Sequence, residues 1–172
     1  MVLESVTLDH KELILSIFER SSDFFTRVEG CRPTLRTVEE ALLGIPSTTC
    51  PKYRKEFLVI RCEGEPMGTV ELHCHHPEEG IVYIGLLLLP QEYRGYGIGR
   101  KAYDAIERYL SERYACQRVL LGVSDDNDVS GFWSKLGFRA NGKNYCWMGE
   151  RKANNVVEYE KWLTRSFQEL SL

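Results

Sequence analysis

A strand–turn–helix unit rich in glycine lies in the middle of the chain. Residues 81–89 form a nearly continuous apolar run, which is typical of a strand covered on both faces. Gly95, Gly97 and Gly99 follow, and an amphipathic helix is predicted over residues 97–114. Glycine permits a positive φ and close backbone approach, and a helix N-terminus presents unpaired N–H groups. The unit therefore predicts a phosphate-binding turn next to a buried strand.

Two nucleotide-binding patterns do not fit this turn. The Walker A pattern needs Gly-Lys followed by Ser or Thr, and the chain contains no such triplet. The dinucleotide pattern G-x-G-x-x-G would start at Gly95 and would need Gly or Ala where the chain has Arg100. A generic phosphate-binding module and a purely structural turn both stay open at this point.

The apolar patterns on either side predict one domain of the α+β (mixed α/β) class. Helices come first, an antiparallel meander follows, and a β-α-β-α-β order closes the chain. Residues 47–55 are expected to form a surface loop, and residues 164–172 a tail or a terminal helix. The expected elements are helices at 9–18, 24–28, 37–43, 97–114 and 128–136 and strands at 57–62, 67–74, 81–89, 119–123 and 156–162.

Composition excludes several classes of partner. A net charge of −3 provides no basic field for nucleic acid, and no apolar run approaches the roughly 20 residues that span a bilayer. The six cysteines show no C-x-x-C spacing, so we interpret them as reduced residues and expect no metal. The first residues show neither a basic leader nor an apolar signal core. We therefore expect a cytoplasmic protein without nucleic-acid or membrane partners.

Two motifs together resemble the GCN5-related N-acetyltransferase (GNAT) superfamily. The segment from Arg94 to Gly99 is similar to its Q/R-x-x-G-x-G/A signature, and Asn127 with the Phe-Trp-x-x-Leu-Gly-Phe segment at 132–138 is similar to its second element. The resemblance implies a twisted, mostly antiparallel sheet of six or seven strands with two splayed parallel strands, flanked by about four helices. It also implies a single domain over residues 1–172. Its expected parts are acceptor-side helices at 1–56, an acetyl-CoA-binding core at 57–138, C-terminal strands at 139–162 and a tail at 163–172.

The resemblance implies where acetyl-CoA would bind. The pyrophosphate would lie on backbone amides of the turn, and the pantetheine arm would pair with the preceding strand in the gap between the splayed strands. Asn127 would hydrogen-bond the arm from the other side; Asp126 is the alternative, because the spacing to Trp133 is one residue short. The implied coenzyme residues are Leu87, Leu88, Leu89, Arg94, Gly95, Tyr96, Gly97, Ile98, Gly99, Arg100, Asn127, Phe132 and Trp133.

The catalytic groups are less defined, because Trp133 stands where many relatives place the Tyr that protonates the leaving thiolate. An indole N–H can donate a hydrogen bond but cannot act as the acid. Another tyrosine, Tyr83 or Tyr145, or solvent would therefore have to supply the proton. An amine also has to lose a proton before attack. Strand periodicity places Glu71, His73 and His75 on one face, which makes Glu71 or His73 the predicted base.

The resemblance implies direct acetyl transfer to a primary amine in a ternary complex. The first 56 residues would form the acceptor wall, and Phe25, Glu29 and Tyr83 would contact the acceptor. A small-molecule or peptide amine fits equally well at this stage. A non-catalytic acyl-CoA-binding sensor is the alternative. A homodimer through edge pairing of residues 156–162 is a further expectation.

Overall fold

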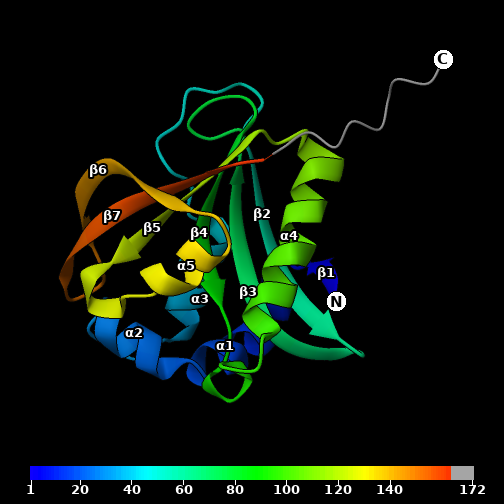
Figure 1. Ribbon diagram of the computed structural model, residues 1–172. Coiled ribbons are helices and arrows are strands. Elements are labelled where there is room, and N and C mark those ends of the chain that lie inside the picture. The colour runs from blue at the N-terminus through cyan, green and yellow to red at the C-terminus, as the bar shows by residue number, and fades with distance from the viewer. Residues whose placement is uncertain (164–172) are drawn as a thin grey trace.

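The computed structural model describes residues 1–163, in which one mixed sheet is covered by helices (Figure 1). Residues 164–172, for which a tail or a terminal helix was expected, lie outside the described residues. The sheet has seven strands in the order β1-β2-β3-β4-β5-β7-β6, and the described residues form five α-helices. The α+β class and the mostly antiparallel sheet are confirmed.

The observed elements follow the predicted order with small changes of boundary, except that no strand was predicted over residues 2–5. The strands are β1 (Val2–Ser5), β2 (Arg54–Cys62), β3 (Glu65–Cys74), β4 (Ile81–Leu88), β5 (Arg118–Ser124), β6 (Arg139–Met148) and β7 (Ala153–Trp162). The helices are α1 (Lys11–Glu19), α2 (Ser22–Val28), α3 (Leu35–Leu43), α4 (Ile98–Tyr114) and α5 (Ser130–Lys135). Short 3-10 turns occupy Leu8–His10, Gln91–Tyr93 and Asp125–Asn127.

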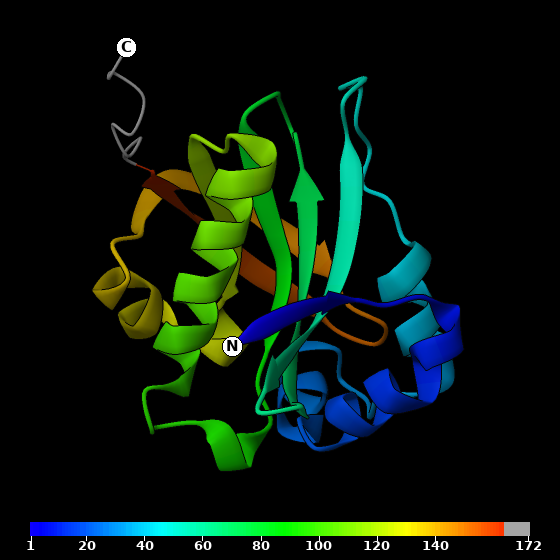
Figure 2. The same ribbon diagram turned by 90° about the vertical axis from the view of Figure 1, so that its right-hand side faces the viewer.

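Alternation along β2 explains the two layers of the core. Leu58 and Ile60 are buried in the cluster that includes α4, whereas Phe57 and Val59 are buried in the cluster with α1, α2 and α3. Successive strand side chains point to opposite faces, so a strand with four consecutive buried apolar residues is covered on both sides. Figure 2 shows α4 along one face of the sheet and the N-terminal helices on the other.

Three sequence predictions are wrong in detail. The helix expected at 37–43 begins at Leu35, because Thr34 is its N-cap and accepts a hydrogen bond from the Thr37 N–H. Strand β7 lies between β5 and β6, so residues 156–162 do not form an edge strand for dimerisation. His75 does not continue the face of Glu71, because β3 ends at Cys74 and His75 has a left-handed backbone with φ of 57°.

Candidate active site

The parallel strands β4 and β5 separate halfway along their length (Figure 1). Their pairing runs from Ile81 and Arg118 to Ile84 and Leu121 and continues no further. Gly85 is also a bulge, because Glu71 of β3 pairs with Leu86 while the next β3 residue, Leu72, pairs with Ile84. Beyond the last pair, β4 therefore offers backbone groups that β5 does not use. We call the point where the two strands part, at Gly85 and Gly122, the apex.

The glycine-rich turn leads directly into α4, and the local structure explains why two of its residues are glycine. Gly97 is the N-cap of α4 with a left-handed backbone (φ 75°), which a residue with a side chain rarely adopts. At Gly99 an added Cβ would lie 2.9 Å from Cε2 of Phe132, so this glycine lets α4 approach α5 closely. Gly97 has no side-chain hydrogen bond that caps the first N–H groups of α4, which remain available to an anion.

The two arginines of the turn make protein contacts. Arg94 donates to both carboxylate oxygens of Asp23 on α2, at 2.6 and 3.2 Å, and its Nε donates to the Leu89 carbonyl. Arg100 donates to the carbonyl of Lys135 at the end of α5. Arg94 thus ties the turn to the N-terminal helices. The contact of either arginine with phosphate stays a prediction.

The second motif presents one polar side chain and buries two aromatic ones. Asn127 lines the cavity described below, while Asp126 forms a 3.0 Å ion pair with Lys152, which favours Asn127 for the predicted coenzyme contact. Trp133 is only 6% exposed, and its ring packs against Tyr103 and Phe138. The indole therefore belongs to the core, and the ring of Phe132 packs beside it.

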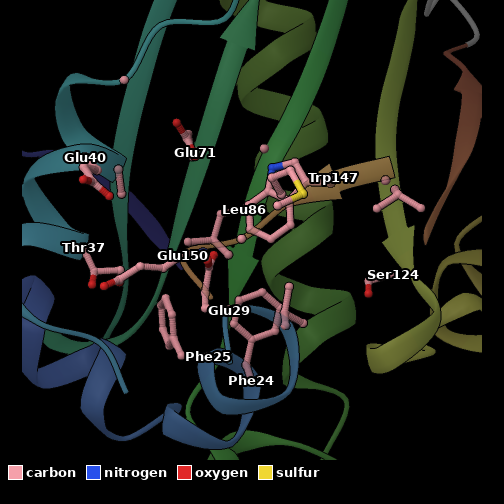
Figure 3. A pocket seen from close by; sticks show the side chains of 18 of the residues that line it. Phe24, Phe25, Glu29, Thr37, Glu40, Glu71, Leu86, Ser124, Trp147 and Glu150 are labelled. Atoms are coloured by element: carbon pink, nitrogen blue, oxygen red, sulfur yellow. Dashed lines mark hydrogen bonds between the residues drawn. The ribbon is translucent and has the colours of Figure 1, made fainter. Parts of the chain in front are cut away.

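A cavity of about 860 Å³ lies between the splayed strands and the N-terminal helices. Its walls include Phe25 of α2, Tyr83 and Leu86 of β4, and the turn after β6. Figure 3 shows acidic side chains around it, with Glu71 on the strands and the others nearer the helices. Among residues 1–163, the charged groups of its wall are four carboxylates and one guanidinium, from Glu29, Glu40, Glu71, Glu150 and Arg36.

Glu71 and His73 form a hydrogen-bonded pair beside the apex. Glu71 Oε1 lies 2.6 Å from Lys55 Nζ and 3.3 Å from His73 Nε2, and Tyr53 Oη lies 2.9 Å from His73 Nδ1. An added Cβ on Gly85 would lie 2.9 Å from His73 Nε2 and 3.0 Å from Glu71 Oε2. Both groups thus lie directly against the β4 backbone at the point where it leaves β5.

The protonation of Glu71 follows from these contacts. Burial by itself raises the pKa of a carboxyl group, but the hydrogen bond with His73 and the charge of Lys55 outweigh it and lower the pKa of Glu71. Glu71 is therefore ionised at neutral pH. The neighbouring His76 has its pKa lowered, mainly by burial, and its ring packs against Tyr83 and His73.

Glu29 joins α2 to the turn between β6 and β7. Its Oε2 accepts a 2.8 Å hydrogen bond from the Glu150 N–H, and its carbonyl accepts one from the Arg151 N–H. Burial raises the pKa of Glu29, and the negative charges of Glu150 and Glu40 add to the effect. A half-buried carboxylate surrounded by like charges is a place where a bound cation relieves repulsion.

Tyr83 and Tyr145 face each other across the other side of the apex. Their hydroxyl oxygens lie 2.5 Å apart, although one residue is on β4 and the other on β6. An added Cβ on Gly122 would lie 2.5 Å from Tyr145 Oη and 3.0 Å from Tyr83 Oη. The structure therefore brings Glu71, His73 and Tyr83 together with Tyr145 around one cavity.

Several site residues were not found by sequence reasoning. Lys55 and Tyr53 lie in the segment expected to form a surface loop, and no local pattern links them to Glu71 and His73. Glu40 on α3 and Glu150 after β6 belong to no binding-site motif, and only the fold brings them to the cavity of Glu29. These residues share no spacing signal that could have identified them.

Comparison with known proteins identifies the class of protein to which the chain belongs. Residues 17–138 match the acetyltransferase (GNAT) family. The chain is 28% identical over 148 residues to spermine/spermidine N(1)-acetyltransferase of Bacillus subtilis (strain 168), covering 82% of this chain and 89% of that protein. An acetyltransferase from Thermus thermophilus has the same fold, with a TM-score of 0.72, 23% identity and coverage of 94% and 96%. An aminoglycoside acetyltransferase solved with coenzyme A has a TM-score of 0.69 at 19% identity, and 94% of each chain is covered.

The fold and the family match define an acetyl-transferring enzyme. The chain belongs to the GNAT acetyltransferase family and is an acetyl-CoA-dependent N-acetyltransferase. In the part of the chain that the structure describes, no three His, Cys, Asp or Glu side chains are grouped to hold a metal ion. Within residues 1–163 no helix has the length and apolar character needed to cross a membrane.

Proposed function

We propose that this enzyme transfers acetyl directly from acetyl-CoA to a primary amine of a small polycationic acceptor of the polyamine class, with both substrates bound at once. The observation that carries this proposal is the cavity beside the splayed strands, whose wall holds four carboxylates and one guanidinium. The similarity to a spermine/spermidine acetyltransferase supports the same acceptor class.

The coenzyme would occupy the groove that starts at the glycine-rich turn. Its pyrophosphate would accept hydrogen bonds from backbone amides between Gly95 and Arg100, aided by the positive end of α4. The amide groups of pantetheine would pair with the free edge of β4 near residues 87–89, as an added strand does. Asn127 would contact the arm from the β5 side. This orientation directs the thioester toward the apex.

The acceptor would enter from the helix side of the cavity. An amine near the apex would meet Glu71, which is ionised and attracts an ammonium group. A second ammonium of the same molecule would lie by Glu29 and Glu150, where burial and mutual repulsion already raise the pKa of Glu29. Phe25 and Leu86 line the wall between these charges and suit the methylene chain of a polyamine. A monoamine would use only one of the two ends.

The group that removes the proton from the amine is inferred from the Glu71–His73 pair, which lies against Gly85. An aliphatic amine has a pKa of about 10.4, so it reaches the cavity protonated and has to lose one proton before attack. The lowered pKa of Glu71 makes this carboxylate a weak base but a good partner for the ammonium. The hydrogen-bonded Glu71–His73 pair would take the proton as a unit, and Tyr53 holds the other ring nitrogen of His73.

The acceptor proposal is tested by steady-state kinetics with spermidine and with hexylamine as a monoamine. We expect kcat/KM for spermidine to exceed that for hexylamine by at least about tenfold, which corresponds to about 1.4 kcal/mol. The double variant Glu40→Gln/Glu150→Gln should raise KM for spermidine about tenfold and leave KM for acetyl-CoA unchanged. Glu112→Gln, at an exposed position of α4, is the matched control. Equal rates with the two amines would contradict the polycation proposal.

The coenzyme proposal is tested by thermal melting. Acetyl-CoA at about 100 times its dissociation constant should add about 2.7 kcal/mol of stability. At roughly 2–4 °C per kcal/mol for a domain of this size, that gives a clear upward shift of Tm. ATP and NAD are the controls. An equal shift with ATP would mean that the turn binds phosphate without a pantetheine groove, and tight acetyl-CoA binding without amine turnover would favour an acyl-CoA sensor.

A further inference from the structure

The apex has two chemically different sides. On the β4 side, Gly85 leaves room for Glu71 and His73, which can accept a proton. On the β5 side, Gly122 leaves room for the hydroxyl groups of Tyr83 and Tyr145, which can donate one. These two glycines are the first residues of β4 and β5 beyond their last pair. A thioester at the apex would therefore have a base on one side and two phenols on the other.

Neither Trp133 in the core nor Tyr53 beside the Glu71–His73 pair can replace Tyr83 and Tyr145 as proton donors to the sulfur. Trp133 is packed into the core and has no acidic hydroxyl. The hydroxyl of Tyr53 is already bonded to His73 Nδ1, on the side of the proton acceptor. Both Tyr83 and Tyr145 line the cavity, and Tyr145 is the more exposed of the two, with 38% of its surface accessible.

The two phenols are not equivalent. Burial raises the pKa of both, so both are protonated at neutral pH. Their hydroxyl oxygens lie 2.5 Å apart, so one hydroxyl donates to the other, and either can be the donor. When Tyr83 donates, the proton of Tyr145, the more exposed of the two residues, is free to point into the cavity. The other ionisable group that faces Tyr145 is Glu158 of β7, whose charge further raises the pKa of Tyr145.

We propose that Tyr145 is the catalytic proton donor to the sulfur of coenzyme A and that Tyr83 is the positioning residue behind it, in place of the tyrosine missing at position 133. The inference rests on the proposed function. The Glu71–His73 pair first takes one proton from the ammonium group and passes it to water in the cavity. As the neutral amine nitrogen bonds to the acetyl carbon and the C–S bond breaks, the nitrogen gives its second proton to the same pair and the sulfur takes one from Tyr145. The Tyr145 oxygen is stabilised by the Tyr83 hydroxyl and regains a proton from water in the cavity. The products are the acetylated amine and the free thiol.

The first test compares tyrosine-to-phenylalanine variants in the acetylation of spermidine. Tyr145→Phe should lower kcat about 100-fold, within the usual range for a general acid, with KM for both substrates within about twofold of wild type. Tyr83→Phe should lower kcat about tenfold, and the double variant should be no slower than Tyr145→Phe, because Tyr83 acts through Tyr145. Tyr109→Phe, on α4 and outside the cavity, is the matched control and should keep full kcat.

The second test separates proton donation from a structural role. Tyr145→3,5-difluorotyrosine keeps the size and hydrogen bonds of the phenol but makes it more acidic. Its alkaline loss of kcat should occur at lower pH than in wild type, whereas the acetyl-CoA-induced shift of Tm should not change. A Tyr145→Phe variant with wild-type kcat, or an alkaline limb that does not move, would overturn this inference while leaving the proposed function intact. A wild-type enzyme that binds acetyl-CoA but acetylates no amine would overturn both.

Discussion

Gly122→Ala perturbs the apex without removing any functional group. The added methyl would lie 2.5 Å from Tyr145 Oη and 2.6 Å from Val156 Cγ1, whereas Cβ atoms essentially never make contacts below 3.0 Å. Tyr145 therefore has to retreat by about half an ångström or more. A displacement of about 1 Å at a reacting group lowers the rate about 100-fold, so we expect kcat to fall between about 10- and 100-fold.

The same substitution should have only a modest effect on stability. Overpacking costs about 1–3 kcal/mol, and replacing glycine by alanine within a strand offsets about 0.5–1 kcal/mol of that. A net loss of about 1 kcal/mol corresponds to a fall in Tm of roughly 2–4 °C. A thermal melt measured beside the kinetics would show whether the protein remains folded at the assay temperature.

A double-mutant cycle identifies the cause of the lost activity. If Gly122→Ala acts by displacing the Tyr145 hydroxyl, it should lower kcat very little further in the Tyr145→Phe background. The assay is thiol release from acetyl-CoA with saturating spermidine for the wild type, the two single variants and the double variant. Effects that multiply in the double variant would refute the reasoning, because the glycine would then matter for another reason.

Three further predictions concern residues around the cavity. Asp23→Asn should weaken acetyl-CoA binding a few-fold in calorimetry and lower stability by no more than about 1 kcal/mol, because the Arg94–Asp23 pair is about one-third exposed. Glu29→Gln should keep the bond to the Glu150 N–H and raise KM for spermidine, but not for acetyl-CoA. Glu71→Gln should remove a stabilisation that is present above the ordinary pKa of Glu and lost as pH falls through the lower pKa of the folded state. Urea unfolding at neutral and acidic pH should then separate wild type from Glu71→Gln only at the higher pH.

Much of the strand–turn–helix unit that is proposed to bind the coenzyme could be predicted from the sequence, because its signals are local. The buried strand, the glycine turn and the start of α4 are consecutive, and Gly97 and Gly99 are needed for backbone conformation and close packing. Asn127 follows β5 directly, so its place at the carboxyl end of that strand is a consequence of chain order. The pattern of apolar residues was sufficient for the class of fold.

The acceptor side could not be predicted because its contacts join distant segments. Asp23 meets Arg94, and Glu29 meets Glu150, across 71 and 121 residues of chain. The strand period of two correctly predicted that Glu71 and His73 lie on one face of β3. It failed at His75, which follows the end of β3 and has a left-handed backbone. The sequence suggested both Tyr83 and Tyr145 as possible acids without indicating that their hydroxyl oxygens would lie 2.5 Å apart.

The central claim, direct transfer at the apex to a polycationic amine, is tested most directly by initial rates. Acetyl-CoA and spermidine would be varied together, and the release of free thiol would be matched to the amount of acetylated amine. Direct transfer predicts equal amounts of the two products and double-reciprocal lines that intersect, as two substrates bound at once require. Parallel lines, which indicate a covalent acetyl-enzyme, or thiol release without acetylated spermidine, would contradict it.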